Sequence, residues 1–219
     1  MKVSIIAAAS VCGRIGQGFK GSAVDRAFLE RMREDTDASL IGAGTLRQGP
    51  VQMLGPGGRT LDGRTRAVIT ASGRIPTEDQ PLFSRGPRPL IFTSRQAGPA
   101  LEQALGQRAE IIPIGYMGPG RLDLREVMEH LSERGVESLL IEGGSALNYE
   151  ALSQAVVHEL LVTICPEIIG ASSVSSLVEG PEPLGRPSIG LRPLECKVSL
   201  ESGEIFIRYA VDYGMQEQE

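Results

Sequence analysis

Several short, apolar-rich runs constrain the fold of this chain more than any other feature of the sequence. They lie at residues 3–9, 66–71, 89–93, 109–114 and 138–141. Each run is bounded by polar residues, glycine or proline and is shorter than a typical buried helix, so it predicts a buried strand. The first run is nearly continuous in its apolar character, which is typical of a parallel sheet covered on both faces.

Amphipathic segments between these runs predict the helices that cover the sheet. Ser22, with Asp25 three residues later, resembles a capping signal, and an apolar stripe then continues to Arg33. Asp123 begins a second helix, which Gly135 is placed to end. A third helix follows the turn at residues 142–144. The side chains expected to face the core are Val24, Ala27, Phe28 and Met32 in the first helix, Leu124, Val127, Met128 and Leu131 in the second, and Leu147, Ala151 and Ala155 in the third.

The pattern changes to strands near the C-terminus. Residues 158–165, 195–200 and 204–213 favour strands, and residues 201–203 suit a hairpin between the last two. Alternating strands and helices followed by this hairpin predict an α/β fold with a mixed sheet and helices on both faces. The Gly- and Pro-rich stretch 49–63 predicts a mobile surface loop. A chain of 219 residues suits one such fold, so residues 1–219 are expected to form a single domain.

Charge, hydropathy and cysteine usage exclude several classes of protein. The formal net charge of −5 and the scattered arginines argue against nucleic acid as a partner. The longest apolar runs, such as residues 160–165, are far shorter than the ~20 residues that cross a bilayer. The three cysteines have neither disulfide nor zinc-site spacing, so no metal is expected. With no secretion signal in view, the sequence favours a cytoplasmic protein.

Two glycine turns after predicted strands are the features that point most directly to ligand binding. In the first, Glu142-Gly143-Gly144 is followed by a helix that Ser145 is expected to cap. Glycines let a diphosphate approach the backbone, and the N–H groups at the helix N-terminus favour negative charge. A tight strand-to-helix turn without a ligand is the alternative. The second turn, Gly42-Ala43-Gly44-Thr45, follows the same logic.

The tripeptide Thr93-Ser94-Arg95 ends another predicted strand. Two hydroxyls beside a guanidinium suit a phosphomonoester such as the 2′-phosphate of NADPH. Polar residues that simply meet solvent at a strand end are the alternative explanation.

Glu142 is the candidate catalytic residue, because it follows a central strand where open α/β sheets place their ligands. Its carboxylate could hold a heterocycle donor, orient a ribose, or donate a proton if partial burial raised its pKa. Stabilisation of the helix that follows is the alternative. Ser10 and Cys12 also lie just past a strand, but Cys12 has the character of a small buried filler. His130 and His158 are expected to be structural.

Taken in order, these segments resemble the reductase domain of riboflavin biosynthesis, a family of the dihydrofolate-reductase-like superfamily. Residues 10–15 stand where the family has a Ser-x-Asp-Gly-Lys/Arg-Ile turn, and residues 22–45 resemble its first helix and second strand. The resemblance continues in order at Ile75-Pro76, Phe92-Thr93-Ser94, residues 140–144, Glu159-Leu160 and residues 166–170.

The resemblance implies an α/β/α sandwich, a homodimer, and a reductase that moves hydride from NADPH to the ribosyl C1 of a phosphorylated aminouracil. Glu142 would face both ligands. The cofactor-binding residues would be Gly42, Gly44, Thr45, Thr93, Ser94, Arg95, Gly143, Gly144 and Ser145. The substrate-binding residues would be Ser10, Cys12, Gly13, Arg33, Arg47 and Gln48.

The chain departs from the family on the substrate side. Cys12 replaces the Asp of the first turn, and Gln48-Gly49-Pro50 replaces the family's Asp-Asp-Pro. The Asp of the family's Asp-Glu-Leu is His158. We therefore expect a small heterocyclic substrate of the pyrimidine or pteridine type. The alternatives are a dihydrofolate or pteridine reductase and an inactive NADP-binding homologue.

Overall fold

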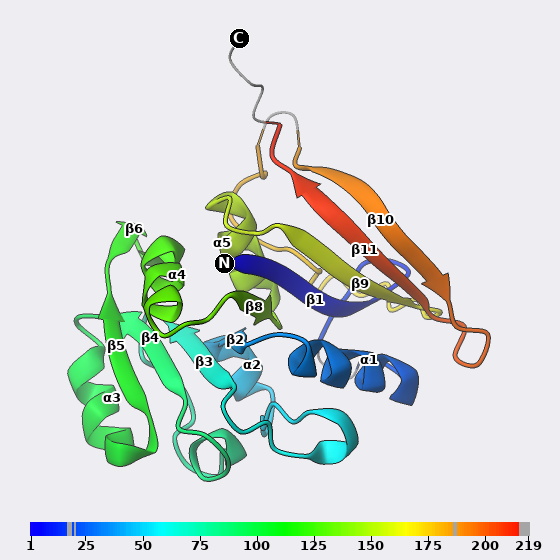
Figure 1. Cartoon of the computed structure of the whole chain (residues 1–219). Helices are drawn as coiled ribbons and strands as arrows, with labels where there is room; N and C mark the ends of the chain where they lie inside the picture. Colours follow the sequence, from blue (N-terminus) through cyan, green and yellow to red (C-terminus); the bar gives the residue numbers. More distant parts are fainter. Residues whose placement is uncertain (17–18, 20, 186–187, 215–219) are drawn as a thin grey trace.

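The computed structural model describes residues 1–16, 19, 21–185 and 188–214. Its centre is a nine-stranded sheet in the order β10-β11-β9-β1-β8-β2-β3-β4-β5 (Figure 1). The strands of this sheet are β1 (Lys2–Ser10), β2 (Ala38–Gly42), β3 (Thr65–Thr70), β4 (Leu90–Ser94), β5 (Glu110–Ile114), β8 (Ser138–Ile141), β9 (Glu159–Cys165), β10 (Gly190–Val198) and β11 (Ile205–Asp212). A separate small hairpin pairs β6 (Tyr116–Gly118) with β7 (Arg121–Leu122).

The sheet is mixed but mainly parallel, as predicted. Strands β1 to β5, β8 and β9 pair in parallel, whereas β11 is antiparallel to both of its neighbours, β9 and β10. The chain leaves β1, builds β2 to β5 in one direction, and returns to place β8 between β1 and β2. The strand order therefore reverses beside β8, which is where sheets of this type bind ligands.

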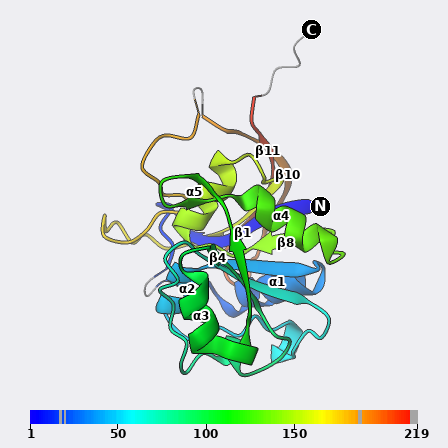
Figure 2. The ribbon, with the colours of Figure 1, turned by 90° about the vertical axis from the view of Figure 1, so that its left-hand side faces the viewer.

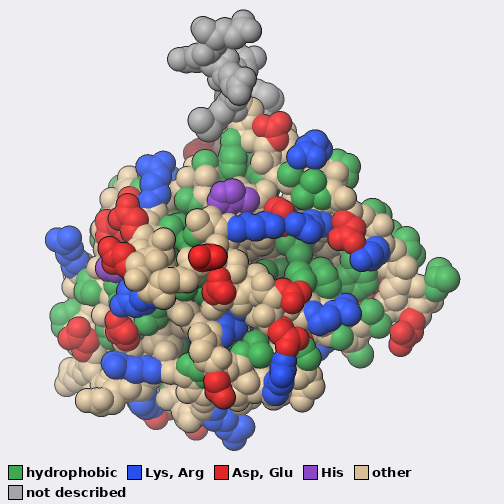
Figure 3. Space-filling model, in the orientation of Figure 1, with side chains coloured by type: hydrophobic (Ala, Val, Ile, Leu, Met, Phe, Trp, Pro, Cys, Tyr) green, Lys and Arg blue, Asp and Glu red, His purple; other side chains and the backbone are tan. Residues whose placement is uncertain are grey.

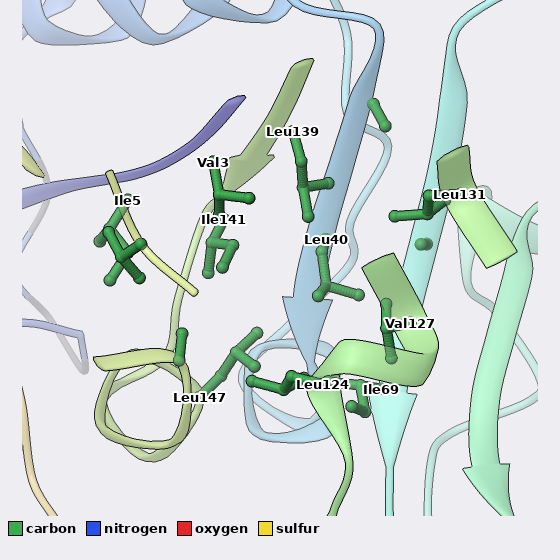
Figure 4. Close-up of a cluster of buried hydrophobic side chains, with 14 of the residues drawn as sticks. Val3, Ile5, Leu40, Ile69, Leu124, Val127, Leu131, Leu139, Ile141 and Leu147 are labelled. Carbon is green, nitrogen blue, oxygen red and sulfur yellow. The ribbon is translucent and has the colours of Figure 1, made fainter. Parts of the chain in front are cut away.

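Helices cover both faces of the sheet and complete three layers. The helices are α1 (Ala23–Glu34), α2 (Ala43–Arg47), α3 (Gly98–Leu105), α4 (Leu124–Glu133) and α5 (Ser145–Ser153). On one face, α4 and α5 pack on a core that includes Ile5, Leu40 and Ile141 (Figures 2 and 4). On the other face, α2 and α3 cover the β2 to β5 half, while α1 covers β1, β8 and β9. The predicted α/β/α sandwich is thus confirmed.

The first helix begins where the sequence predicts, but its N-terminus is held from a distant segment. The Ser22 hydroxyl accepts hydrogen bonds from the Val24 and Asp25 amides. The Ser22 N–H, which the residue-25 side chain of a capping box would normally satisfy, donates instead to Glu204 at 2.8 Å. Glu204 is 2% exposed and stands just before β11. The C-terminal hairpin therefore anchors α1.

Some local predictions were wrong. Ala155 lies beyond the end of α5 and has a φ of +54°. The N-cap of α5 is Gly144 rather than Ser145, and it makes no side-chain cap hydrogen bond. The stretch 49–63 is not simply a surface loop, because Met53 is buried in the core beneath α2 and α3. Helices α2 and α3 were not predicted, and α3 begins after Ala97 without a side-chain cap.

The surface mixes both signs of charge. On the face drawn in Figure 3, Lys and Arg side chains are interspersed with Asp and Glu. Among the described residues, no helix combines the length and apolar character needed to cross a membrane.

Candidate active site

Two adjoining cavities open at the carboxyl ends of the parallel strands. The first, of about 450 Å³, is lined by glycines of the two predicted turns, by residues 70–72 and by residues 120–122. We name it the glycine cavity. The second, of about 580 Å³, is walled by α1, by residues 50–54 and by Glu142, and we name it the α1 cavity. Both are lined by Ile15, Gly16, Gln48 and Gly144, so the two cavities meet at one junction.

Backbone groups dominate one wall of the glycine cavity. Gly42, Gly44 and Gly144 line it, and a Cβ built on Gly44 would meet no atom closer than 3.9 Å. Gly143 has a φ of +82°, a conformation that favours glycine. The amides that begin α5 receive no side-chain cap. This wall can therefore accept a group that presses against the backbone and carries negative charge.

Glu142 is largely buried in a hydrogen-bonded pair with Arg33. The Arg33 guanidinium donates from Nε to Glu142 Oε1 at 2.9 Å and from Nη2 to Oε2 at 2.6 Å, and both side chains are 7% exposed. The Ser39 hydroxyl donates to the same carboxylate. Burial alone would raise the pKa of Glu142, but the Arg33 charge and hydrogen bonds, with that of Ser39, hold it below its ordinary value. The condition for proton donation by Glu142, a pKa raised by partial burial, is therefore not met.

A second buried arginine supports this pair. Arg64 donates from Nη2 to Ser39 Oγ and to the Ala38 carbonyl, each at 2.8 Å. Burial lowers the pKa of Arg64 to about 10, which leaves it charged at neutral pH. Arg33 Nη1 donates to the Leu54 carbonyl at 2.8 Å, so the same cluster fixes the segment that walls the α1 cavity.

The turn after β1 brings different residues to the junction than the sequence predicts. Ile15 and Gly16 line both cavities, whereas Ser10, Cys12 and Gly13 line neither. Cys12 is exposed, so its description as a buried filler is wrong. Its hydrogen bond with Ser10 and those from backbone amides such as Gly170 lower the pKa of the Cys12 thiol to about 7.

Of the remaining predicted residues, four line a cavity and three do not. Arg47 and Ser145 line the glycine cavity, Thr45 lines the α1 cavity, and Gln48 stands at the junction. Three residues line neither cavity. The Thr93 hydroxyl donates to the Thr70 carbonyl at 2.7 Å, the Ser94 hydroxyl accepts from the Ala97 amide, and Arg95 is exposed. Binding of a phosphate by Thr93, Ser94 and Arg95 stays a prediction.

Several residues that line the cavities were not predicted from the sequence. Ser72 lines the glycine cavity from the turn after β3 and Arg121 lines it from β7, whereas Asp25 lines the α1 cavity from α1. Arg121 is held by Glu150 of α5 at 2.9 Å. None of these residues lies in a glycine turn. The α1 stripe itself was a usable signal for Asp25, because a charged residue one turn before Leu29 faces the same side.

The RibD C-terminal domain family matches residues 2–204. The chain belongs to that family. A relative named 2,5-diamino-6-ribosylamino-4(3H)-pyrimidinone 5′-phosphate reductase, from Methanothermobacter thermautotrophicus, is 30% identical and is covered over 97% of its length by 95% of this chain. A reductase of the same name from Archaeoglobus fulgidus is 26% identical over 71% of this chain and 74% of its own.

Solved structures of the RibD family share the fold. A pyrimidine reductase-like protein from Corynebacterium diphtheriae superposes with a TM-score of 0.74 at 24% identity, over 96% of this chain and 91% of its own. The riboflavin biosynthesis reductase Rib7 of Saccharomyces cerevisiae gives 0.76 at 16% identity, over 96% and 89% of the two chains. The predicted dihydrofolate-reductase-like fold is confirmed, and this RibD-family chain belongs among the reductases.

Proposed function

We propose that the chain is an NADPH-dependent reductase that converts the ribosyl group of a phosphorylated ribosylaminopyrimidine into a ribityl group. The observation that carries this proposal is the junction of a glycine-walled cavity with a cavity lined by polar side chains, at the switch point of the sheet. Reduction requires two ligands that meet at one point, and this site offers two compartments with four shared lining residues.

The glycine cavity suits a dinucleotide. Gly42, Gly44 and Gly144 leave room where side chains would stand, and the uncapped start of α5 at Ser145 favours a diphosphate. Arg47 and Arg121 bring positive charge to the same lining. When bound, NADPH supplies the hydride. The chain supplies position, because holding two reactants at one junction removes much of the entropic barrier.

The α1 cavity suits the pyrimidine substrate. Glu142 stays ionised and fixed by Arg33, so it acts as a rigid acceptor for donor groups and not as a proton donor. The carboxamide of Gln48 stands at the junction, where it can hydrogen-bond the sugar hydroxyls near C1. The apolar side chains of Leu29 and Met53 complete the wall and help to exclude water.

An anaerobic assay tests this proposal. NADPH oxidation is followed by the fall in absorbance when the protein meets the aminopyrimidine ribosylamino phosphate or its uracil counterpart, and the ribityl product is identified by mass spectrometry. We expect turnover of at least one of the two and NADPH binding at micromolar protein. Failure to bind NADPH at that concentration contradicts the proposal.

The same assay separates the two alternatives. Dihydrofolate reductase activity is the second candidate, because Asp25 is a helix-borne acid on the cavity wall. Turnover of dihydrofolate without turnover of the ribosylamino phosphates would support it. Tight NADPH binding with no turnover of any pyrimidine or pteridine would identify an inactive homologue.

We further propose that the chain acts as a cytoplasmic homodimer. Strand β10 is exposed along its whole length at the edge of the sheet, with Leu191 and Leu194 each more than 40% exposed. An edge of this kind favours cover by another chain. Light scattering coupled to size exclusion checks the expected doubling of mass.

A further inference from the structure

Glu150 is an unexpected residue in the wall of the glycine cavity. It is the only carboxylate among the described residues that line this cavity, and the other charged side chains of the lining belong to Arg47 and Arg121. The cavity otherwise suits a diphosphate, and an unpaired carboxylate would repel such a ligand. The presence of Glu150 therefore calls for a reason in the contacts that it makes.

The partner of Glu150 is Arg121, the first residue of β7. Its Nε donates to both carboxylate oxygens, at 3.0 Å to Oε1 and at 2.9 Å to Oε2, and its Nη2 donates to the Ser153 hydroxyl at 2.7 Å. Two side chains of α5 therefore hold the guanidinium. The side chain of Arg121 is 40% exposed and that of Glu150 is 25% exposed, so the pair is only partly desolvated.

The backbone that follows Arg121 is tied to the same helix. The Gln154 carboxamide donates from Nε2 to the Leu122 carbonyl at 3.0 Å, and its oxygen accepts from the Leu124 amide at 2.8 Å. Gln154 is the C-cap residue of α5 and is 3% exposed. The β6–β7 hairpin lies outside the nine-stranded sheet, so these contacts fix its end on α5. Both the main chain and the guanidinium of Arg121 are thus held in position.

The contacts with α5 use only some of the donors of Arg121. A guanidinium carries five N–H donors, and Nη1 has no hydrogen-bond partner among the residues that the structure describes. Adjacent N–H groups of a guanidinium match two oxygens of a phosphate.

The unused donors of Arg121 stand near the place where a diphosphate is favoured. Ser145, the first residue of α5, lines the same cavity as Arg121 and Glu150. Glu150 follows Ser145 at a helical rise of about 7.5 Å. A diphosphate at the start of α5 and the guanidinium held by Glu150 can together bridge this distance.

We propose that Arg121 is a cofactor-binding residue that donates hydrogen bonds to the diphosphate of the dinucleotide, and that Glu150 is a positioning residue that holds Arg121 for this contact. The inference rests on the proposed function, because it requires a dinucleotide in the glycine cavity. Pairing with Arg121 reduces the repulsion between Glu150 and the diphosphate. A guanidinium that is already held also loses less rotamer freedom when the ligand binds.

Titration of NADPH and NADH into the wild type and into Arg121→Met tests the contact with the diphosphate. Both cofactors carry the diphosphate, whereas only NADPH carries the 2′-phosphate, and the fluorescence of the reduced nicotinamide reports binding. Both dissociation constants should rise by roughly 5- to 30-fold, less than for a fully buried charged contact because Arg121 is partly exposed. A rise for NADPH alone, or no rise for either cofactor, overturns the assignment.

Glu150→Gln in two backgrounds tests the positioning role. In the wild type this change should weaken NADPH binding by about two- to fivefold, because Arg121 loses its charged partner. In Arg121→Met the same change should tighten NADPH binding by about two- to fivefold, because it then removes only the repulsion by the carboxylate. A merely structural role predicts the same sign in both backgrounds. Equal signs in folded variants therefore overturn the positioning role.

The matched control is Arg134→Met. Arg134 pairs with Glu110 at 2.6 Å, its side chain is 35% exposed, and it lines neither cavity. The substitution changes the net charge by the same amount and should leave both dissociation constants within about twofold. Thermal melting shows whether each variant is folded. A wild type that binds neither cofactor contradicts the proposed function, whereas wild-type binding that Arg121→Met does not weaken contradicts this inference alone.

Discussion

The glycine cavity and the α1 cavity meet at one junction, but backbone groups dominate the wall of the first and side chains that of the second. The glycine cavity is walled by backbone, in turns that are continuous in sequence, such as Gly144 and Ser145 at the start of α5. The α1 cavity depends on side chains from distant segments, above all Arg33 and Glu142, which are 109 residues apart. A backbone wall tolerates changes elsewhere in the chain, whereas a side-chain cluster fails when any member is removed.

Arg33→Met tests this difference with the largest expected effect. Removal of the guanidinium leaves the Glu142 carboxylate buried without its partner, which should cost about 3–5 kcal/mol of unfolding free energy and abolish turnover. Urea denaturation measures the cost. The double variant Arg33→Met, Glu142→Leu should recover most of the stability but not the activity, because two apolar side chains replace two charges.

A control variant and a pH dependence sharpen this prediction. The surface pair of Arg134 with Glu110 is the matched control, and Arg134→Met should cost at most about 1 kcal/mol. The pKa of Glu142 is lowered in the folded chain, so its contribution is present above the unfolded pKa and is lost as pH falls through the folded value. The deficit of Arg33→Met should therefore shrink in acid. A deficit equal to that of Arg134→Met would contradict the cluster.

Gly44→Ala tests the backbone wall. Alanine inside α2 should stabilise the helix by about 1 kcal/mol, since Gly44 has an ordinary helical conformation. The added methyl group occupies space in the glycine cavity and should weaken NADPH binding by roughly 5- to 150-fold, the equivalent of about 1–3 kcal/mol of overpacking. Fluorescence titration measures binding, and thermal melting measures stability.

The control for Gly44→Ala is Gly57→Ala. Gly57 has a φ of +67°, and it lines neither cavity. Alanine there should destabilise the chain by about 1 kcal/mol through backbone strain and leave NADPH binding unchanged. If Gly44→Ala binds NADPH as tightly as the wild type, the glycine cavity is not the cofactor site.

Alkylation of Cys12 tests the environment of the turn after β1, which lies outside both cavities. Its thiol has a pKa of about 7, so alkylation by iodoacetamide should rise with pH through a midpoint near that value. Cys165 is buried, with a pKa of about 12, and should stay unmodified in the folded chain. Peptide mass spectrometry distinguishes the two thiols. Alkylation of Cys12 that rises only well above pH 8 would contradict the predicted environment.

Arg95→Ala carries the smallest expected effect. Arg95 is exposed at the end of β4 and lines neither cavity, so a contact with the 2′-phosphate would be largely solvated. NADPH binding should weaken by about two- to fivefold, within the range of exposed ion pairs, while NADH binding stays unchanged. Equal losses for both cofactors would remove Arg95 from the site.

The sequence was most informative where a structural feature depends on residues that are adjacent in the chain. The turn at residues 142–144, the cap at Ser22 and the stop at Gly135 each depend on local chemistry, and the predicted strands and main helices are confirmed. Pairs such as Arg33 with Glu142 form only after β8 inserts beside β2, which no local pattern encodes. The sequence therefore singled out Glu142 but could not decide between its possible roles, because its protonation depends on this distant partner.

Exposure was also hard to predict for single polar or small residues. Cys12 was expected to be buried and is exposed, whereas the Thr93 and Ser94 hydroxyls are buried and hydrogen-bonded to the Thr70 carbonyl and the Ala97 amide. Helix α3 was missed because a Gly-Pro start without a capping side chain resembles a turn. For Cys12, Thr93 and Ser94, tertiary packing decides whether a side chain near a strand end is exposed or buried.

The bond between Glu204 and Ser22 gives the C-terminal hairpin an influence on a site that it does not line. Glu204 also accepts from the Ser202 hydroxyl, so the hairpin turn and the start of α1 share one carboxylate. A second copy docked on β10, or a chain cut before β11, would thus change how the N-terminus of α1 is anchored. Helix α1 walls the α1 cavity, so the shape of that cavity would change with it. Quaternary contacts and the position of α1 would then be linked through a single side chain.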